Sequence, residues 1–398
     1  MKNIQKNIKT NTTTEINKRR QVKNENKTHI INHIDYLDYI SINSFCTGMG
    51  SVLTALKELG CNLDVKASIE LEKHPRNTVA HNFKVKKQFI DLFYASASHL
   101  DYADIFSGGF PCQNFSLAGK LKGFDDRRGT VIFHLFQIIL DLIKSNKAPK
   151  IIFLENVAHL ARHDLKKGEY ETEFGNNFTK RIGHTMKVIE EEVLKPLSKY
   201  YNISWGIENS KNHNVPHNRN RLFFVMIRKD LPYDFNFSQV REKRNELTTC
   251  LKDYLEPNHK VDLKYFSKKE FLPESYRNSG EILRVGSLLG VSYLQSRRVI
   301  SPKGISATLT TGEDAKYLTG KNKVRTLTVK EKLRIQTYPK WYQFPKDIPD
   351  TAKHKMLGNT MTVNVVKNIF TAIFESRKVS ANNTNFEKTT ITTAKKGA

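Results

Sequence analysis

The sequence predicts an α/β protein with a doubly wound, mostly parallel sheet and a second, smaller domain. Short apolar stretches alternate with helical patterns over residues 36–230, which is typical of a parallel sheet that helices cover on both faces. From about Leu231 to Pro349 this alternation gives way to charged, loop-rich sequence with short β-like pieces. These two observations predict a large α/β domain followed by a smaller one.

Each expected element of the large domain lies on a short apolar stretch or an amphipathic pattern. Strands are expected at Ser41–Cys46, Val65–Glu70, Ala103–Ser107, Ile151–Leu154 and Leu222–Ile227, and helices notably at Ser51–Leu59 and Thr130–Lys144. The second domain includes a β-like piece at Arg297–Ile300. A helical pattern at Val363–Phe374, within residues 350–377, is expected to return to the large domain.

Both ends of the chain are polar. Residues 1–35 are rich in Lys, Asn and Thr and have no sustained apolar period, and residues 378–398 are similar. Such segments bury too little apolar surface to offset the entropy that ordering costs. The sequence therefore predicts a flexible basic arm at the start and a disordered tail at the end.

The charge of the chain indicates a polyanionic partner. Its 398 residues include 65 Lys and Arg against 40 Asp and Glu, a formal net charge of +25. A strongly basic balance is typical of nucleic-acid binders, although a solvated basic surface is the plainer alternative. The four cysteines show no CxxC spacing, which favours reduced thiols in the cytoplasm over disulfides or a metal site. No apolar run is long enough for a membrane span or a signal peptide.

The segment Ser44 to Ser51 (SFCTGMGS) leaves a predicted strand and opens a predicted helix. Glycines at such a turn let the backbone approach a ligand at the helix N-terminus. Glu70 follows about 20 residues later at the end of the next strand, where a carboxylate can accept ribose hydroxyls. Asp91 is placed to accept from an adenine amino group. The loop predicts a nucleoside-containing cofactor, with an ordinary tight turn as the alternative.

The segment GGFPCQNFS, residues 108–116, presents Cys112 just after a predicted strand. An accessible thiolate in a positive potential is a nucleophile, whereas a lone cysteine is more often a small buried apolar residue. Two other segments favour the catalytic interpretation. A predicted strand ends in Glu155, and Arg219 and Arg221 are two residues apart and so are expected on one face of a strand.

His213 and His217 have the spacing of a helical metal pair. Pro216 lies between them and no third ligand is near in sequence, so a zinc site is not expected.

The ordered segments GFPCQNFS, GKLKGFDDRRG, LENV, NVPHNRNRLFFV, RVISPKGISATLT, RTLTVKEKLRIQTYP and LGNTM resemble the motifs of C5-cytosine DNA methyltransferases of the bacterial restriction-modification type. The resemblance extends from about Ser41 to Phe374. It implies a Rossmann-like methyltransferase domain that uses S-adenosylmethionine, and a smaller target-recognition domain that binds double-stranded DNA. A monomer, a cytoplasmic location and a genetically linked restriction endonuclease are also expected.

The resemblance implies that Cys112 is the nucleophile with Gln113 beside it, that Glu155 holds the cytosine edge, and that Arg219 and Arg221 support the base and its phosphate. The implied cofactor contacts are Phe45, Cys46, Gly48, Gly50, Glu70, Leu71, Asp91, Leu92, Pro111, Val131, Asn359 and Thr360. DNA contacts are expected from Ser116, Arg128, Arg297 and Arg298.

Two positions in the glycine loop depart from the family pattern. Cys46 stands where an aromatic residue usually contacts the adenine, and Ser51 stands where a further glycine is common. Moving the alignment by one residue makes Phe45 the aromatic residue instead.

Three other functions compete with a DNA cytosine-5 methyltransferase. A related branch of the family methylates tRNA, but its nucleophile loop typically differs from GFPCQNFS. A catalytically inactive DNA-binding regulator has no need of Cys112, Glu155 and both arginines together. A nicotinamide-dependent dehydrogenase is the third, and the glycine loop lacks its full three-glycine fingerprint.

Overall fold

The computed structural model describes residues 39–110, 130–175, 181–279, 281–312 and 314–378. Its largest unit is a seven-stranded sheet with the order β3-β2-β1-β4-β5-β9-β8. Its strands are β1 (Tyr39–Phe45), β2 (Asn62–Ile69), β3 (Val85–Phe89), β4 (Ile105–Gly109), β5 (Ile151–Val157), β8 (Tyr201–Asn209) and β9 (Asn220–Arg228). The neighbours from β3 to β5 pair in parallel, and β9 is antiparallel to both β5 and β8. The prediction of a mostly parallel sheet is confirmed.

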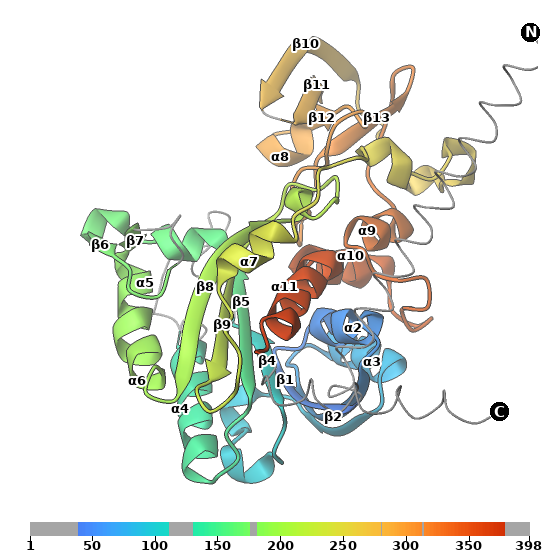
Figure 1. The fold of residues 1–398 in the computed structure, drawn as a ribbon. Coiled ribbons are helices and arrows are strands. Elements are labelled where there is room, and N and C mark those ends of the chain that lie inside the picture. Colours follow the sequence, from blue (N-terminus) through green and yellow to red (C-terminus); the bar gives the residue numbers. More distant parts are fainter. Residues whose placement is uncertain (1–38, 111–129, 176–180, 280, 313, 379–398) are drawn as a thin grey trace, which may run out of the picture.

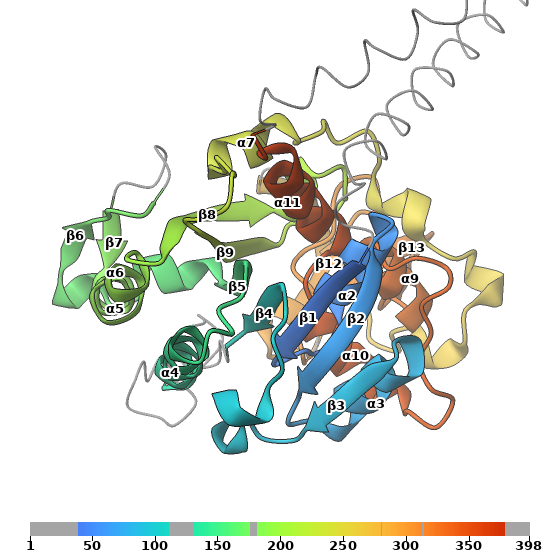
Figure 2. The same ribbon diagram turned by 60° about the horizontal axis from the view of Figure 1, so that its bottom comes forward.

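Helices cover both faces of this sheet (Figures 1 and 2). One face packs against α2 (Ser51–Glu58), α7 (Phe237–Glu242) and α11 (Val363–Glu375), and the other against α4 (Val131–Lys144) and α5 (His184–Ile189). The apolar run of β5 explains both contacts, because Ile151 and Phe153 face the first layer while Ile152 and Leu154 face the second. Burying side chains of this size stabilises the fold by about 1.5–3 kcal/mol each.

The strand order reverses direction between β1 and β4, since the chain builds β2 and β3 on one side of β1 and β4 and β5 on the other. Gly108 of β4 allows these two central strands to approach closely, because a Cβ at this position would lie 2.6 Å from the carbonyl oxygen of Phe45. In doubly wound sheets, ligands bind at the carboxyl ends of the strands beside such a reversal. The fold therefore places the candidate site at the ends of β1 and β4.

A second sheet forms a separate lobe, seen at the top of Figure 1. Its order is β10-β11-β12-β13-β14. Its strands are β10 (Phe271–Ser279), β11 (Ile282–Leu288), β12 (Arg298–Ile300), β13 (Lys316–Gly320) and β14 (Lys323–Arg325), with the short helix α8 (Leu294–Arg297) before β12. Two small apolar clusters support the lobe, one around Ile300 and Tyr317 and one around Leu288 and Val324. We call residues 244–327 the recognition lobe.

The chain returns to the large sheet through α9 (Val329–Ile335), α10 (Asp350–Asn359) and α11. Tyr338, Tyr342 and Ile348 belong to the same apolar cluster as α2 and α11, as do Phe237 and Val240. Parts of the predicted 231–349 segment therefore pack on the large sheet, and the second sheet itself occupies residues 271–325.

The remaining elements complete the outer parts of the molecule. They include α3 (Lys73–Asn82), β6 (Glu169–Glu171), β7 (Arg181–Gly183), a π-helical turn (Glu190–Leu194), α6 (Lys195–Leu197) and several short 3-10 helices. Among the helices within the described ranges, none has the length and apolar character needed to cross a bilayer.

Candidate active site

The glycine loop connects β1 to α2 through three residues with left-handed backbone. Cys46, Gly48 and Gly50 have φ angles of 45°, 55° and 75°. A hydrogen bond from the Gly50 amide to the Thr47 carbonyl (2.9 Å) closes the turn, and the Thr47 amide donates to the Ile69 carbonyl of β2 (3.2 Å). Glycine adopts this conformation without steric cost. The backbone is thus held in a tight turn at the N-terminus of α2, where we expected the cofactor.

Glu70 holds the glycine loop from the end of β2. Its carboxylate accepts hydrogen bonds from the backbone amides of Gly48 (2.8 Å) and Glu72 (3.0 Å). Burial raises the pKa of Glu70, and the two amide bonds partly oppose this shift. A carboxylate has about four acceptor positions, so two amides leave capacity for ribose hydroxyls. Beside it, Leu71 and Ile90 expose 66% and 58% of their surface at the ends of β2 and β3, which offers an apolar surface to a base.

The two alternative residues for the adenine contact have different surroundings. Phe45 is fully buried and stacks on Phe106 with a centroid distance of 4.0 Å. The Cys46 thiol is half-buried, and burial followed by the charges of Glu70 and Asp91 raises its pKa to about 12. Cys46 therefore stays a neutral thiol at physiological pH. Asp91 accepts a hydrogen bond from the Phe93 amide (3.0 Å) in the turn after β3.

The segment 357–361 (LGNTM) meets the glycine loop through a cluster of three hydroxyls. The Ser51 Oγ lies 2.7 Å from the Thr360 Oγ1 and 3.0 Å from the Tyr338 Oη. The Tyr338 Oη lies 2.5 Å from the Thr360 Oγ1. Ser51, which replaces the glycine expected here, thus ties the start of α2 to the end of α10. Asn359 precedes this cluster and is exposed.

Glu155, near the carboxyl end of β5, and Arg221, at the start of the antiparallel strand β9, form an ion pair with 2.9 Å between Arg221 Nε and Glu155 Oε1. Both side chains are mostly buried, with 15% and 13% of the Arg221 and Glu155 side-chain surface exposed. Burial raises the pKa of Glu155, against the opposing charges of Arg221 and Arg219. A Cβ at Gly109 would lie 3.3 Å from Glu155 Oε2, so the end of β4 runs directly beside this carboxyl group.

Arg219 lies in a different environment from Arg221. It is 1% exposed, and its Nη1 donates to the Leu309 carbonyl (3.1 Å) while its Nη2 donates to the carbonyls of Gly358 (2.9 Å) and Thr360 (2.6 Å). We expected the two arginines on one face because of the two-residue period of a strand. The charges of both arginines act to lower the pKa of Glu155, but it is Arg221 that forms an ion pair with it.

Several predicted residues lie outside the described residues, namely Pro111, Cys112, Gln113, Ser116 and Arg128. The described chain stops at Phe110, whose carbonyl accepts a hydrogen bond from the Asn156 side chain (3.1 Å) next to Glu155. It resumes at Thr130, just before buried Val131 at the start of α4. Residues 111–129, which include Cys112, therefore follow in sequence from the carboxyl end of β4, at the same end of the sheet as Glu155 and Glu70. Leu92 is buried in the core near this end of the sheet.

The two histidines of the possible metal pair have other partners. His213 Nε2 lies 3.0 Å from Glu208 Oε2, and its Nδ1 lies 2.8 Å from the Asn368 amide nitrogen. His217 Nε2 accepts from the Leu309 amide (3.2 Å). Across the described ranges, no group of three or more His, Cys, Asp or Glu side chains is arranged to hold a metal ion.

In the recognition lobe, Arg297 ends α8 and Arg298 begins β12, and both are exposed. Leu289, Tyr293 and Leu294 nearby expose 53%, 54% and 58% of their surface. The arginines are thus accessible to a large ligand.

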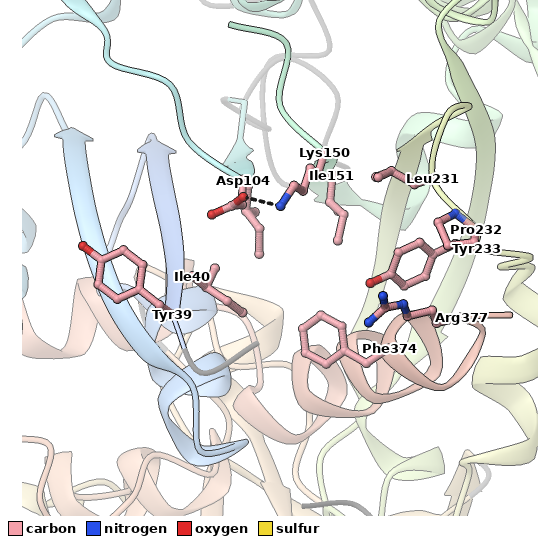
Figure 3. A pocket seen from close by; sticks show the side chains of 11 residues that line it. Tyr39, Ile40, Asp104, Lys150, Ile151, Leu231, Pro232, Tyr233, Phe374 and Arg377 are labelled. Atoms are coloured by element: carbon pink, nitrogen blue, oxygen red, sulfur yellow. Dashed lines mark ion pairs between the residues drawn. The ribbon is translucent and has the colours of Figure 1, made fainter. Parts of the chain in front are cut away.

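A pocket lies at the starts of β1, β4 and β5, at the other end of these strands from the glycine loop (Figure 3). Its walls include Tyr39 and Ile40 at the start of β1, and the ion pair between Lys150 and Asp104 (2.9 Å) beside the starts of β5 and β4. Phe374 near the end of α11 closes another side. The pocket therefore shares no strand end with the glycine loop.

The comparisons with known proteins agree with this fold. The family model for C-5 cytosine-specific DNA methylase matches residues 40–375. The chain belongs to this family. It is therefore a DNA cytosine-5 methyltransferase, and the resemblance inferred from its motifs is confirmed.

Curated relatives cover most of this methylase. The Type II methyltransferase M.HhaI of Haemophilus parahaemolyticus is 30% identical over 333 residues, which cover 81% of this chain and 90% of that protein. The Type II methyltransferase M.Bsp6I of a Bacillus species is 28% identical over 85% of this chain and 99% of its own length.

Solved structures support the fold alone, because their identities are low. The Dnmt2 methyltransferase of S. pombe has a TM-score of 0.61 at 17% identity, covering 85% of this methylase and 98% of that chain. A putative DNA modification methyltransferase encoded within an E. coli prophage has a TM-score of 0.59 at 19% identity, covering 85% and 99%.

Sequence reasoning missed several residues of the site. Arg219 contacts the carbonyls of Leu309 and Gly358, and Thr360 contacts the Tyr338 hydroxyl. Each pair is far apart in sequence, and Gly358 gives no signal of its own within a helical pattern. The quoted motifs contain all three residues, but motif order does not reveal which side chains meet.

Proposed function

We propose that this methylase transfers a methyl group from S-adenosylmethionine to carbon 5 of a cytosine that has rotated out of duplex DNA, with Cys112 as the covalent nucleophile. The main support is the position of the Glu155–Arg221 pair beside the end of β4. Strand β4 is a neighbour of β1, from which the glycine loop continues. The end of β4, after which Cys112 follows in the sequence, thus lies between the glycine loop of β1 and the carboxyl group of Glu155 on β5, where the reacting base would be held.

S-adenosylmethionine fits the residues at the ends of β1, β2 and β3. Gly48 leaves open space for close approach of a ligand, Glu70 retains acceptor capacity for ribose hydroxyls, and exposed Leu71 offers an apolar face to adenine. Gly50 permits the positive φ that the turn requires. When bound, the cofactor supplies a methyl group on a positively charged sulfur. The other proposed contacts are Phe45, Cys46, Asp91, Leu92, Pro111, Val131, Asn359 and Thr360.

Cys112 solves the chemical difficulty that carbon 5 of cytosine is a poor nucleophile. Its thiolate adds to carbon 6, a carbon–sulfur bond forms, and the electron pair of the ring double bond moves toward carbon 5 and ring nitrogen 3. Carbon 5 then attacks the methyl group of S-adenosylmethionine, the bond between that methyl carbon and the sulfur breaks, and S-adenosylhomocysteine leaves as a neutral thioether. A base removes the carbon 5 proton, the carbon–sulfur bond breaks, and the thiolate leaves as the double bond is restored.

Glu155 is proposed to share a proton with ring nitrogen 3 while negative charge develops on the ring. Burial raises the pKa of this carboxyl group, which favours a proton-holding role. Arg221 orients the carboxyl group through the Nε–Oε1 contact of 2.9 Å. Gln113 is proposed to lie beside the flipped nucleotide, and the sequence-based role of Arg219 at the base remains a prediction.

DNA is proposed to bind between the large sheet and the recognition lobe. Carbon 6 is inaccessible inside stacked duplex DNA, so the target base must leave the helix. The net charge of +25 favours binding to phosphates. Ser116 and Arg128 are proposed to contact DNA near the target, and exposed Arg297 and Arg298 to read base edges in the major groove.

In the cell, the methylase is proposed to act as a cytoplasmic monomer that protects DNA from a linked restriction endonuclease. The Type II names of the curated relatives support this role. The basic residues 1–35 would add phosphate contacts that are independent of sequence.

Bisulfite sequencing of DNA from cells that express the protein tests this function. We expect 5-methylcytosine at one short sequence context, and none when Cys112→Ser is expressed at the same level. Parallel assays on purified duplex DNA and tRNA distinguish the tRNA alternative. Methylation of tRNA alone, or an absence of 5-methylcytosine with folded wild-type protein, would overturn the proposal.

A further inference from the structure

Arg219 lies where three separate parts of the chain meet. Its guanidinium group is buried and donates to Leu309 in the recognition lobe and to Gly358 and Thr360 at the end of α10. We propose that Arg219 is a positioning residue that couples cofactor binding to the placement of the recognition lobe. This inference rests on the proposed cofactor site beside Thr360.

On the lobe side, the residues before Arg219 run alongside residues 306–309. The Asn218 amide donates to the Ser306 carbonyl (2.9 Å), and the Ser306 amide donates to the Pro216 carbonyl (2.8 Å). The Thr308 hydroxyl donates to the Asn218 carbonyl (2.5 Å). These bonds form a continuous junction, residues 216–219 with 306–309, through which a shift of Arg219 reaches the lobe.

On the cofactor side, the end of α10 lies directly against the same stretch of the lobe. A Cβ at Gly358 would lie 2.0 Å from the Thr310 carbonyl oxygen, so only glycine permits this approach. Thr360 follows, and its hydroxyl contacts Ser51 at the start of α2 (2.7 Å). A ligand that orders the glycine loop therefore acts on Thr360 and, through the Thr360 carbonyl, on Arg219.

The guanidinium group suits this task because it is planar and presents its donors in a fixed fork. Nη1 donates to a carbonyl of the lobe and Nη2 donates to two carbonyls at the end of α10. The rigid guanidinium plane therefore fixes the distance between the lobe and α10. A lysine ammonium group keeps the charge but has a single nitrogen on a flexible chain. Arg219→Lys should therefore loosen the connection between the two sites. The Ser51–Thr360 and Asn218–Ser306 hydrogen bonds do not involve the guanidinium group and should remain.

The first test measures how much S-adenosylhomocysteine, the cofactor product, tightens binding of duplex DNA. In the wild type we expect a factor of about 5 or more, within the usual range for coupled sites. In Arg219→Lys we expect the factor to fall below about 2, which is close to independent binding.

Arg325→Lys is the matched control. Arg325 is also fully buried and donates to backbone carbonyls, but these belong to Thr326 and Glu256 of the lobe, and its ion pair is with Glu331 in the first turn of α9. It should keep the wild-type coupling even where it lowers stability. Unchanged coupling in Arg219→Lys, or an equal loss in both variants, would overturn the inference.

A second test needs no variant and so does not depend on folding of Arg219→Lys. Amide hydrogen exchange of the wild type is measured with and without S-adenosylhomocysteine. We expect slower exchange at Asn218, Ser306 and Leu309, whose amides donate across the junction. Binding of S-adenosylhomocysteine without this protection sinks the coupling alone, whereas no saturable binding overturns the proposed cofactor site and the coupling with it.

Discussion

The two ends of the strands in the large sheet shift the pKa values of their carboxyl groups in opposite directions. We call the end where parallel strands finish the carboxyl edge and the end where they begin the amino edge. At the carboxyl edge, burial raises the pKa of Glu70 and Glu155. At the amino edge, burial also opposes ionisation of Asp64 and Asp104, but hydrogen bonds from Lys66, Lys86 and Tyr39 to Asp64, and from Ser41 and Lys150 to Asp104, outweigh it and lower both pKa values. For these four carboxyl groups, burial thus acts at both ends of the strands, but only at the amino ends do hydrogen-bond donors and lysines outweigh it.

This difference separates the two carboxyl groups proposed to bind the cofactor and the cytosine from two that stabilise the fold. Asp104 accepts from the Ser41 amide (3.0 Å) and the Ser41 hydroxyl (2.5 Å), and it pairs with Lys150 (2.9 Å) at the pocket in Figure 3. Few acceptor positions remain for a ligand. Glu70 and Glu155 keep acceptor positions and face the strand ends where ligands bind. Chemistry is therefore expected at the carboxyl edge and stability at the amino edge.

The largest effect on this comparison is expected from Glu155→Gln. The amide cannot share a proton with the ring in the same way, so turnover should fall about 100-fold or more, as for a lost general acid. Binding of S-adenosylmethionine should be unchanged. The measurement is single-turnover methyl transfer to duplex DNA, with Asp104→Asn as the carboxyl-to-amide control at the other edge. Equal turnover in the two variants would contradict the assignment of the reactive edge.

A smaller effect is expected from Glu70→Gln, because one oxygen still accepts from a backbone amide while the ribose acceptor weakens. The affinity for S-adenosylmethionine should fall about tenfold, which corresponds to about 1.4 kcal/mol and is typical of a lost charged hydrogen bond. Calorimetric titration measures it. Wild-type affinity would show that Glu70 only shapes the loop.

The smallest effect is expected from Asp104→Asn, on stability rather than activity. Asp104 is part-exposed, so solvent screening limits the loss to about 1 kcal/mol or less at pH 7. Its folded pKa is lowered, so its contribution is present above the unfolded pKa and is lost as pH falls through the folded value. Urea unfolding should show the wild type and the variant converging below about pH 4. A difference that grows toward low pH would contradict this sign.

The sequence predicted the central strands because their apolar runs are buried on both faces, as in β5. The sequence did not predict the two outermost strands of the sheet, β3 and β8. In β3 the residues Lys86, Lys87 and Gln88 are exposed, and β8 mixes polar and apolar residues. An outermost strand pairs with a neighbouring strand on one side only and often carries charged residues on the other. Its composition therefore resembles that of a loop. No local pattern indicated that β9 runs antiparallel to β5.

For the candidate site, the sequence likewise predicted the positions of residues next to central strands but not the contacts between distant segments. Glu70 and Glu155 follow apolar strands, so their place at the carboxyl edge follows from the alternation of strands and helices. The contacts of Arg219 with Leu309 and Thr360 join residues 90 and 141 positions apart. Such contacts depend on how the recognition lobe and α10 pack, which periodicity does not encode.

Covalent trapping on duplex DNA with 5-fluorocytosine at the target position tests the central claim most directly. Fluorine at carbon 5 does not leave as a proton does, so the adduct between Cys112 and carbon 6 should persist. With S-adenosylmethionine present, wild type and Asp104→Asn should form a stable protein–DNA complex, and Cys112→Ser should form none because a hydroxyl is a much weaker nucleophile. Trapping of Cys112→Ser at the wild-type yield, or loss of trapping in a folded Asp104→Asn variant, would contradict a reactive carboxyl edge served by Cys112.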